Sequence, residues 1–191
     1  MTTTIGIIRH GSTDWNKEGR AQGNSDISLN EEGMAQAKKL AARLMTENWD
    51  IIYTSDLCRA KQTAEIIKES TNVELRFDVR LREMGGGQIE GTTEAERIEK
   101  WGVDWRQLDL GLESNEDGLR RGMDCINELA AKHVGKNILI VSHGALIRAI
   151  LGGMSSHFTC EGALQNISFT KLRKVDAAWE CELYNCTAHI M

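Results

Sequence analysis

The sequence predicts an α/β protein built as a three-layer sandwich, in which a mixed, mostly parallel sheet lies between helices on both faces. Apolar strands alternate along the chain with segments of helical periodicity. The clearest strand, residues 138–141, is apolar without interruption, which is typical of a strand buried on both faces of a sheet. With 191 residues, 41% of them hydrophobic, the chain is long enough to bury one ordinary core.

The first half of the chain alternates strand and helix. The helix expected at 30–48 can be capped by Asn30, and two acids stand in its first turn. The helix expected at about 56–69 can be capped by Ser55 or Asp56. The expected strands of this half are residues 4–8, residues 51–53 and a weaker one at 73–77.

The second half is interrupted by an irregular segment, residues 84–115, with three consecutive glycines and two tryptophans. We expect one domain over residues 1–191, with this segment as a cap-like excursion. The remaining elements are helices at about 116–134 and 145–151 and strands at 138–141, 166–172 and 179–184, the last two forming a hairpin.

Composition excludes several classes of protein. The formal net charge is −5, so no basic excess is available for nucleic-acid binding, and any anion site must be a local cluster of Arg and His. No apolar run approaches the roughly 20 residues of a membrane span, and the first residues lack the features of a signal peptide. The five cysteines form no CxxC pair, which indicates free thiols in a reducing cytoplasm.

Residues with recognisable chemistry follow four of the expected strands. Because ligands of α/β sheets bind at the carboxyl ends of the strands, we expect these residues to meet at one edge. They are Arg9 and His10 after the first strand, Arg59 after the second, Glu83 after the third and His143 after residues 138–141.

This set suits a phosphomonoester, which carries roughly two negative charges near neutral pH. Arg9 and Arg59 can bind its oxygens through forked hydrogen bonds. His10 can act as a nucleophile without an activating base, because imidazole is largely neutral at pH 7. His143 can supply a further donor, and a charge if protonated, while Glu83 can give a proton to the leaving oxygen and later activate water.

Each part taken alone is more often structural than functional. An Arg-His-Gly turn is usually a surface turn, a lone arginine a solvated helix residue and a lone glutamate an exposed acid. Together at strand ends they favour a phosphoryl-transfer site. Other chemistries lack their residues: no Cys is followed six positions later by Arg, and no DxDxT aspartate, Walker loop or metal-ligand spacing is present.

At this point the chain resembles the histidine phosphatase superfamily, the phosphoglycerate mutase-like proteins, and within it the small bacterial-type phosphatases. The resemblance covers nearly the whole chain in the family's order. Its most specific segments are 7–16 (IIRHGSTDWN), 19–23 (GRAQG), 29–33 (LNEEG), 55–64 (SDLCRAKQTA), 81–83 (LRE), 140–144 (IVSHG) and 166–169 (NISF).

The resemblance implies specific roles. His10 would be the phosphorylated nucleophile, Glu83 the proton donor and acceptor, and Arg9, Arg59 and His143 the phosphate pocket. It also implies that no metal or organic cofactor is needed. Further residues would line the substrate side or close the pocket, namely Asn16, Gln22, Gly23 and the backbone around Gly144.

Three departures from the family pattern stand near the expected site. Asp56 occupies a position where the family usually has proline, which adds an acid beside the phosphate pocket. The segment 85–87 is Gly-Gly-Gly where aromatic residues are usual, so the loop after Glu83 is expected to be loose. The Glu113-Ser114 pair lacks the glycine that usually precedes it.

The expected activity is hydrolysis of small phosphorylated metabolites through a phosphohistidine. The alternatives are a phosphoglycerate mutase, which is disfavoured because residues 84–115 are short and hold few basic residues, and a non-catalytic protein that binds a phosphorylated ligand. The expected partners are the substrate and neither nucleic acid nor membrane. The exposed edge of the sheet leaves room for a homodimer.

Overall fold

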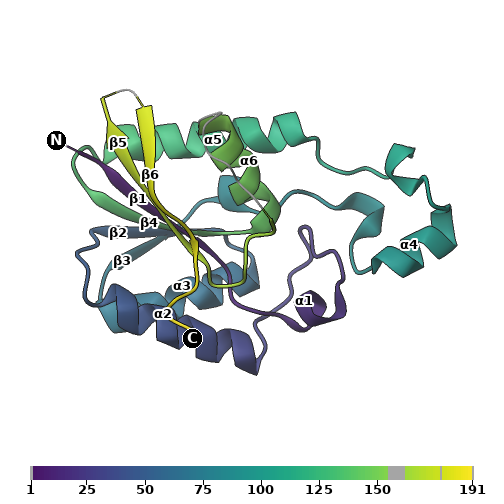
Figure 1. The fold of residues 1–191 in the computed structure, drawn as a ribbon, viewed down its shortest axis with the longest axis horizontal. Coiled ribbons are helices and arrows are strands. Elements are labelled where there is room, and N and C mark those ends of the chain that lie inside the picture. Colours follow the sequence, from purple (N-terminus) through teal and green to yellow (C-terminus); the bar gives the residue numbers. More distant parts are fainter. Residues whose placement is uncertain (1, 155–161, 177, 191) are drawn as a thin grey trace.

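A computed structural model of the chain describes residues 2–154, 162–176 and 178–190. A six-stranded sheet in the order β3-β2-β4-β1-β5-β6 lies between two layers of helices, as Figure 1 shows. β1 to β4 pair in parallel, and β5 and β6 add antiparallel partners at one side. The strands are β1 (Thr4–Arg9), β2 (Ile51–Thr54), β3 (Glu74–Phe77), β4 (Asn137–Ser142), β5 (Phe169–Val175) and β6 (Ala178–Cys186).

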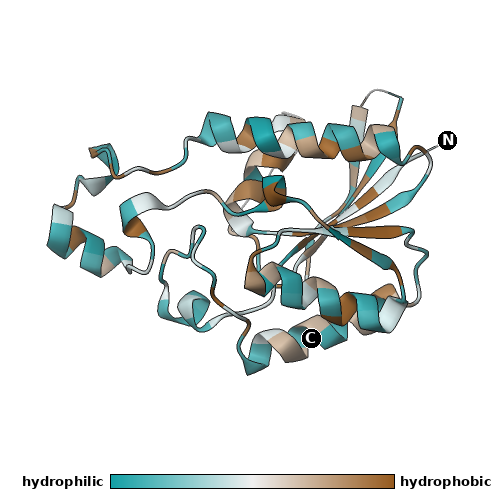
Figure 2. Ribbon diagram, turned by 180° about the vertical axis from the view of Figure 1, so that it is seen from behind, coloured by the Kyte–Doolittle hydropathy of each residue, from teal (hydrophilic) through white to brown (hydrophobic). Residues whose placement is uncertain are grey.

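The predicted three-layer sandwich is confirmed. Alternate residues of the central strands face opposite layers: Ile7 packs with the residues of α5 and α6, whereas Ile8 packs with those of α2 and α3. Figure 2 shows apolar strands between helices with polar outer faces. The helices are α1 (Asp14–Glu18), α2 (Glu31–Leu44), α3 (Cys58–Thr71), α4 (Glu94–Trp101), α5 (Asn115–Lys132) and α6 (Gly144–Met154).

Asn30 caps α2 as predicted, because its Oδ1 accepts a hydrogen bond from the amide of Gly33 at 2.9 Å. The cap predicted for α3 is wrong. This helix begins at Cys58, after Leu57, whose side chain cannot cap. The amide of Cys58 instead donates to Asp26 Oδ1 at 2.6 Å, so a carboxylate distant in sequence occupies the helix N-terminus.

Two further boundaries differ from the prediction. β5 begins at Phe169 instead of Asn166, because Ile167 adopts a φ of +61° and its amide turns to the carbonyls of Arg9 and His10. α5 ends at Lys132, and Val134, predicted to continue its apolar stripe, is 61% exposed.

The segment 84–115 is more ordered than expected. It contains α4 and two short 3-10 turns, Gly87–Ile89 and Trp105–Gln107, and extends away from the sheet (Figure 1). Its own small core consists of Ile89, Trp105 and Leu110, with Ala21 and Trp101 packed against it. The two tryptophans therefore stabilise the excursion, and neither belongs to the two large clusters beside the sheet.

Within the described residues, no helix is long and apolar enough to cross a membrane. The four cysteines of this part of the chain form no disulfide with one another: Cys58, Cys125, Cys181 and Cys186. Cys160 and His157, which matches no motif, lie outside the described residues.

Candidate active site

The sheet topology brings the two histidine segments together. β1 and β4 are adjacent and parallel, and Arg9 lies opposite Ser142 in their register. His10 and His143 are the next residues of the two strands, so their rings meet at the carboxyl edge of the sheet, with centroids 5.1 Å apart and planes inclined by 55°. The juxtaposition expected from the sequence is present.

His10 is almost fully buried, and its Nδ1 lies 2.7 Å from the carbonyl oxygen of Gly11. A carbonyl can only accept, so Nδ1 carries the proton and Nε2 is left with a free lone pair. Burial and the positive charges of Arg59 and Arg9 hold the pKa of His10 well below its usual value. The ring is therefore neutral at pH 7.

Arg59 is fully buried at the start of α3. Its two terminal nitrogens donate to the carbonyls of Gly23 and Ser25, each at 2.7 Å, which fixes the plane of the guanidinium. Burial lowers the pKa of Arg59 to about 10, so the group remains charged at neutral pH. Arg9 is anchored in the same way, by a hydrogen bond from Nη1 to the carbonyl of Leu164.

Several buried nitrogen atoms of the site have no hydrogen-bond partner among the described residues. They include Nε of Arg9, Nε of Arg59 and both ring nitrogens of His143. Burial and the neighbouring Arg59 hold the pKa of His143 well below its usual value, so this ring is also neutral. Two guanidinium groups and a neutral imidazole in one buried place suit an oxyanion, which would accept from these donors and balance the charge.

Glu83 reaches this edge from the turn that follows β3. Its carboxylate accepts hydrogen bonds from the amides of Ala145 and Leu146, at 3.2 and 3.0 Å. These are first-turn amides of α6, which have no acceptor within the helix. The acid thus sits at the N-terminus of the helix that directly follows His143.

The residues predicted for the substrate side form contacts with other residues of the protein. Asn16 Oδ1 accepts from the amide of Thr13, and Gln22 Oε1 accepts from the Thr13 hydroxyl. Gly23 has a φ of +48°, and a Cβ there would collide with the carboxylate of Glu90. Its contribution to the site is the carbonyl that holds Arg59.

The glycines after the two histidines act through close approach. Neither Gly11 nor Gly144 is among the described glycines with a positive φ, so neither is needed for a left-handed turn. A Cβ at Gly144 would lie 3.2 Å from Arg9 Nε, and one at Gly11 would lie 2.8 Å from the carbonyl oxygen of Gly33. Both positions therefore require a small residue.

Two residues that support the nucleophile were missed from the sequence. The hydroxyl of Thr63 accepts from the amide of Gly11 at 3.1 Å, and Asn166 Nδ2 donates to the carbonyl of His10 at 3.1 Å. Thr63 follows Arg59 by one helical turn, which puts both on the same face of α3 and is the signal that was available. Asn166 lies in the segment 166–169 of the family resemblance, but its contact with the His10 carbonyl depends on the break before β5.

Asp56 is paired with an arginine outside the phosphate pocket. Its carboxylate binds the guanidinium of Arg82 through two hydrogen bonds, at 2.6 and 2.5 Å. Arg82 holds the pKa of Asp56 below its usual range. The departure from the family pattern therefore adds an ion pair beside Glu83, instead of a free acid beside Arg59.

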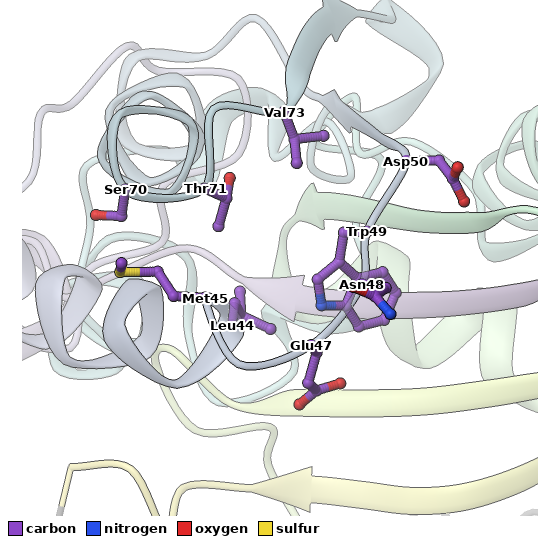
Figure 3. Close-up of a pocket in the computed structure, with 9 residues that line it drawn as sticks. All are labelled: Leu44, Met45, Glu47, Asn48, Trp49, Asp50, Ser70, Thr71 and Val73. Carbon is purple, nitrogen blue, oxygen red and sulfur yellow. The ribbon is translucent and has the colours of Figure 1, made fainter.

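The hollow drawn in Figure 3 has a volume of about 460 Å³ and lies at the other end of the sheet. It is lined by the ends of α2 and α3 and by the residues that precede β2 and β3, including Trp49 and Asp50. None of the predicted site residues lines it. In the part of the chain that the structure describes, no three His, Cys, Asp or Glu side chains are grouped to hold a metal ion.

Comparison with known proteins agrees with this geometry. Residues 5–187 match the family model of the histidine phosphatase superfamily (branch 1). The "Uncharacterized phosphatase PhoE" of Bacillus subtilis (strain 168) is 34% identical over 195 residues, with 98% of this chain and 97% of the relative covered. The solved structure of Bacillus stearothermophilus YhfR superposes with a TM-score of 0.89 at 28% identity, covering 99% of this chain and 100% of that one.

Relatives that are named for different activities match this chain similarly well. The "Metal-independent phosphoserine phosphatase" of Arabidopsis thaliana is 33% identical, covering 98% of this chain and 83% of the relative. The "Probable phosphoglycerate mutase GpmB" of Yersinia pestis (strain Pestoides F) is 33% identical, covering 91% of this chain and 86% of the relative.

Proposed function

The chain belongs to the histidine phosphatase superfamily (branch 1), a family of phosphatases and phosphoglycerate mutases, and we propose that it is a phosphomonoester hydrolase working through a phosphohistidine. The substrates would be small phosphorylated metabolites, of which phosphoserine is the first to test, because it is the substrate named for one relative. Residues 1–191 would form one catalytic domain, with 84–115 as its cap.

The single observation that carries this proposal is the state of His10. A buried, neutral ring with its proton held on Nδ1 by the Gly11 carbonyl offers Nε2 as a nucleophile. A merely structural histidine gains nothing from two neighbouring guanidinium groups, which disfavour its charged form. These groups instead favour a ligand with negative charge at the same place.

In the proposed reaction, Nε2 of His10 attacks phosphorus and the ester P–O bond breaks. The leaving oxygen takes a proton from the protonated carboxyl of Glu83, and the product alcohol departs. Arg9, Arg59 and His143 donate to the transferring oxygens, and bound phosphate dianion would favour a charged His143. Glu83, now a carboxylate, then takes a proton from water as its oxygen attacks phosphorus, releasing inorganic phosphate and neutral His10.

The cap supports hydrolysis over mutase activity. A mutase must also hold a bisphosphate, whose second phosphate group needs further free cations. Residues 84–115 contain three basic residues, and two of them, Arg97 and Arg106, both bind Glu94. The third, Lys100, lies over the ring of Trp101 with its Nζ 4.4 Å from the centroid.

The test measures inorganic phosphate release from a panel of phosphomonoesters, including phosphoserine and 3-phosphoglycerate, with the His10→Ala variant as control. We expect turnover in the wild type, an acid-labile and base-stable phosphoryl group after quenching, and neither in the variant. Interconversion of phosphoglycerates that depends on a bisphosphate primer would identify a mutase. Binding of phosphate without turnover would identify the non-catalytic alternative.

A further inference from the structure

The side chain of Arg121, on α5, uses all of its nitrogens to hold the turn that carries Glu83. Nη1 donates to the carbonyls of Arg80 and Arg82 at 2.8 and 2.7 Å, and Nη2 donates to the carbonyl of Glu83 at 3.0 Å. Nε and Nη2 also donate to the two carboxylate oxygens of Glu113, at 2.6 and 2.8 Å. A planar guanidinium can make this fan of bonds, and an ammonium group cannot.

Glu113 binds the backbone that follows Glu83 in the chain. Its Oε2 accepts from the amide of Gly85 at 2.9 Å, and its own amide donates to the Gly85 carbonyl at 2.8 Å. The Arg121–Glu113 pair therefore grips the backbone both before and after residue 83. Both side chains are about four-fifths buried, which makes the pair less exposed to screening than a surface ion pair.

The Arg121–Glu113 pair fixes the backbone next to the Gly85–Gly87 segment, which the sequence predicts to be loose. Three consecutive glycines carry a high conformational entropy, which only specific contacts can offset. Glu83 itself makes side-chain bonds to its neighbour Met84 and to the start of α6. The direction from which its carboxyl reaches the site is thus set by a backbone that Arg121 and Glu113 hold.

We propose that Arg121, together with Glu113, is the positioning residue that aligns the carboxyl of Glu83 for proton transfer to the leaving oxygen. The inference rests on the proposed function, because it assumes that Glu83 is the general acid. Arg121 hydrogen-bonds to none of the donors of the phosphate pocket, and its charge is the smallest of the causes that lower the pKa of His143, so its loss should change binding of the phosphoryl group little.

A residue that serves stability alone would behave differently. Its loss would lower the melting temperature and leave the relative rates on different substrates unchanged. A positioning residue changes those relative rates, because only poor leaving groups need the proton. Comparison of an alkyl phosphate with p-nitrophenyl phosphate therefore separates the two roles.

The experiment compares Arg121→Met and Glu113→Gln with wild type, and uses Arg80→Met as the matched control. Arg80 also joins the 79–81 turn to α5, through Glu128 at 2.8 Å. Among the described residues its side chain hydrogen-bonds to the carboxylates of Asp78 and Glu128 and to no backbone carbonyl near Glu83. We expect Arg121→Met to lower the rate of the first step, the phosphorylation of His10, by about 10- to 100-fold with phosphoserine, a part of what a general acid contributes. With p-nitrophenyl phosphate the rate of the first step, read from the burst of nitrophenolate, should fall by less than about 3-fold, and vanadate inhibition should stay within about 2-fold. The second step uses Glu83 as a base for both substrates, so the comparison is made on the first step alone.

A double mutant gives the decisive comparison. In a Glu83→Gln background, Arg121→Met should cause little further change in the ratio of the two rates, because the acid it aligns is gone. Equal losses of the first-step rate on both substrates, or the same change of their ratio in Arg80→Met, would overturn the inference. Where Arg121→Met fails to fold by circular dichroism, Arg121→Lys and Glu113→Gln are judged by the same ratio. Failure of the proposed function is distinguishable, since wild-type protein would then release no phosphate or His10→Ala would keep its activity.

Discussion

The carboxylate of Asp56 forms a two-pronged ion pair with the guanidinium of Arg82, immediately before Glu83 in the chain. The pair joins the turn at the start of α3, which carries Arg59, to the turn that carries the acid. It also neutralises the cation that stands next to Glu83. Substitution of Asp56 would therefore change the net charge at the edge of the site without replacing any residue of the phosphate pocket.

We expect Asp56→Asn to strengthen inhibition by inorganic phosphate and by bisphosphates by about 2- to 5-fold, because Arg82 would lose its counter-charge. The free energy of unfolding should change by less than about 1 kcal/mol, as is usual for a half-exposed pair. Inhibition constants and urea denaturation check the two parts. Glu180→Gln is the control, because it removes one of the two acids paired with Arg173, the other being Glu182. Arg173 lies opposite Thr4, at the other end of β1. Unchanged or weaker inhibition in Asp56→Asn would contradict the prediction.

The pH behaviour of His10 and His143 follows from their lowered pKa values. We expect a ring-proton titration by NMR to place the pKa of His10 below 6.5, and the acidic limb of kcat/KM to lie there as well. Arg59→Met should move the His10 pKa upward, because the charge of Arg59 helps to lower it. Arg173→Met, which removes an equal charge from the far end of the sheet, should leave it unchanged. A wild-type pKa at or above 6.5 would contradict this assignment.

The same shifts make stability depend on pH. Between pH 6.5 and the lower pKa of the folded state, the unfolded chain binds protons at His10 and His143 and the native chain does not. The free energy of unfolding contributed by these groups is therefore lost as the pH falls below 6.5. Above pH 6.5 both states are neutral at these positions, and the two histidines should add no pH dependence. Urea denaturation of wild type and a His143→Gln variant from pH 5 to 8 measures the difference.

The fold was largely predictable from the sequence because its central strands, β1, β2 and β4, are buried on both faces. Runs such as 138–141 leave little choice of element, and the alternation with helices then selects a parallel sheet. The meeting of His10 and His143 follows from the same rule, given only that β1 and β4 are neighbours. What was predictable at the site was therefore the part determined by strand ends.

The remaining features depend on contacts between segments far apart in sequence. The N-terminus of α3 is bound by Asp26, a pairing over 32 residues that no local capping rule contains. Asp56 was correctly identified as unusual, yet its direction depends on Arg82, 26 residues later. Ile167 reads as a strand residue by composition, and its positive φ arises from bonds to the backbone of β1 and the residue after it. Each of these needs the tertiary structure before it can be stated.

Binding of an oxyanion should stabilise the fold. The unpartnered donors of Arg9, Arg59 and His143 would gain acceptors, and the mutual repulsion of the two guanidinium groups would be balanced. At about 100 times its Kd, vanadate or phosphate should add about 2.7 kcal/mol, which corresponds to a rise in Tm of about 5 to 10 °C for a chain of this size. Arg59→Lys should lose most of the rise, because an ammonium cannot keep the geometry that Gly23 and Ser25 impose. An equal rise with chloride at matched ionic strength would show that the effect is not specific.

Replacement of Glu83 by Gln tests the proposed role of Glu83 as the general acid at the carboxyl edge of the sheet. Glutamine has nearly the same shape and can still accept from the amides of Ala145 and Leu146, so the protein should fold with little loss of stability. It cannot donate a proton to a leaving alkoxide, and we expect kcat on alkyl phosphates to fall by about 100- to 10,000-fold. Cleavage of p-nitrophenyl phosphate should suffer much less in its first step, since nitrophenolate leaves without a proton. A burst of nitrophenolate followed by slow turnover would indicate that water attack on the phosphohistidine has also lost its base, whereas equal losses of the first step for both substrates would remove Glu83 from the role of acid.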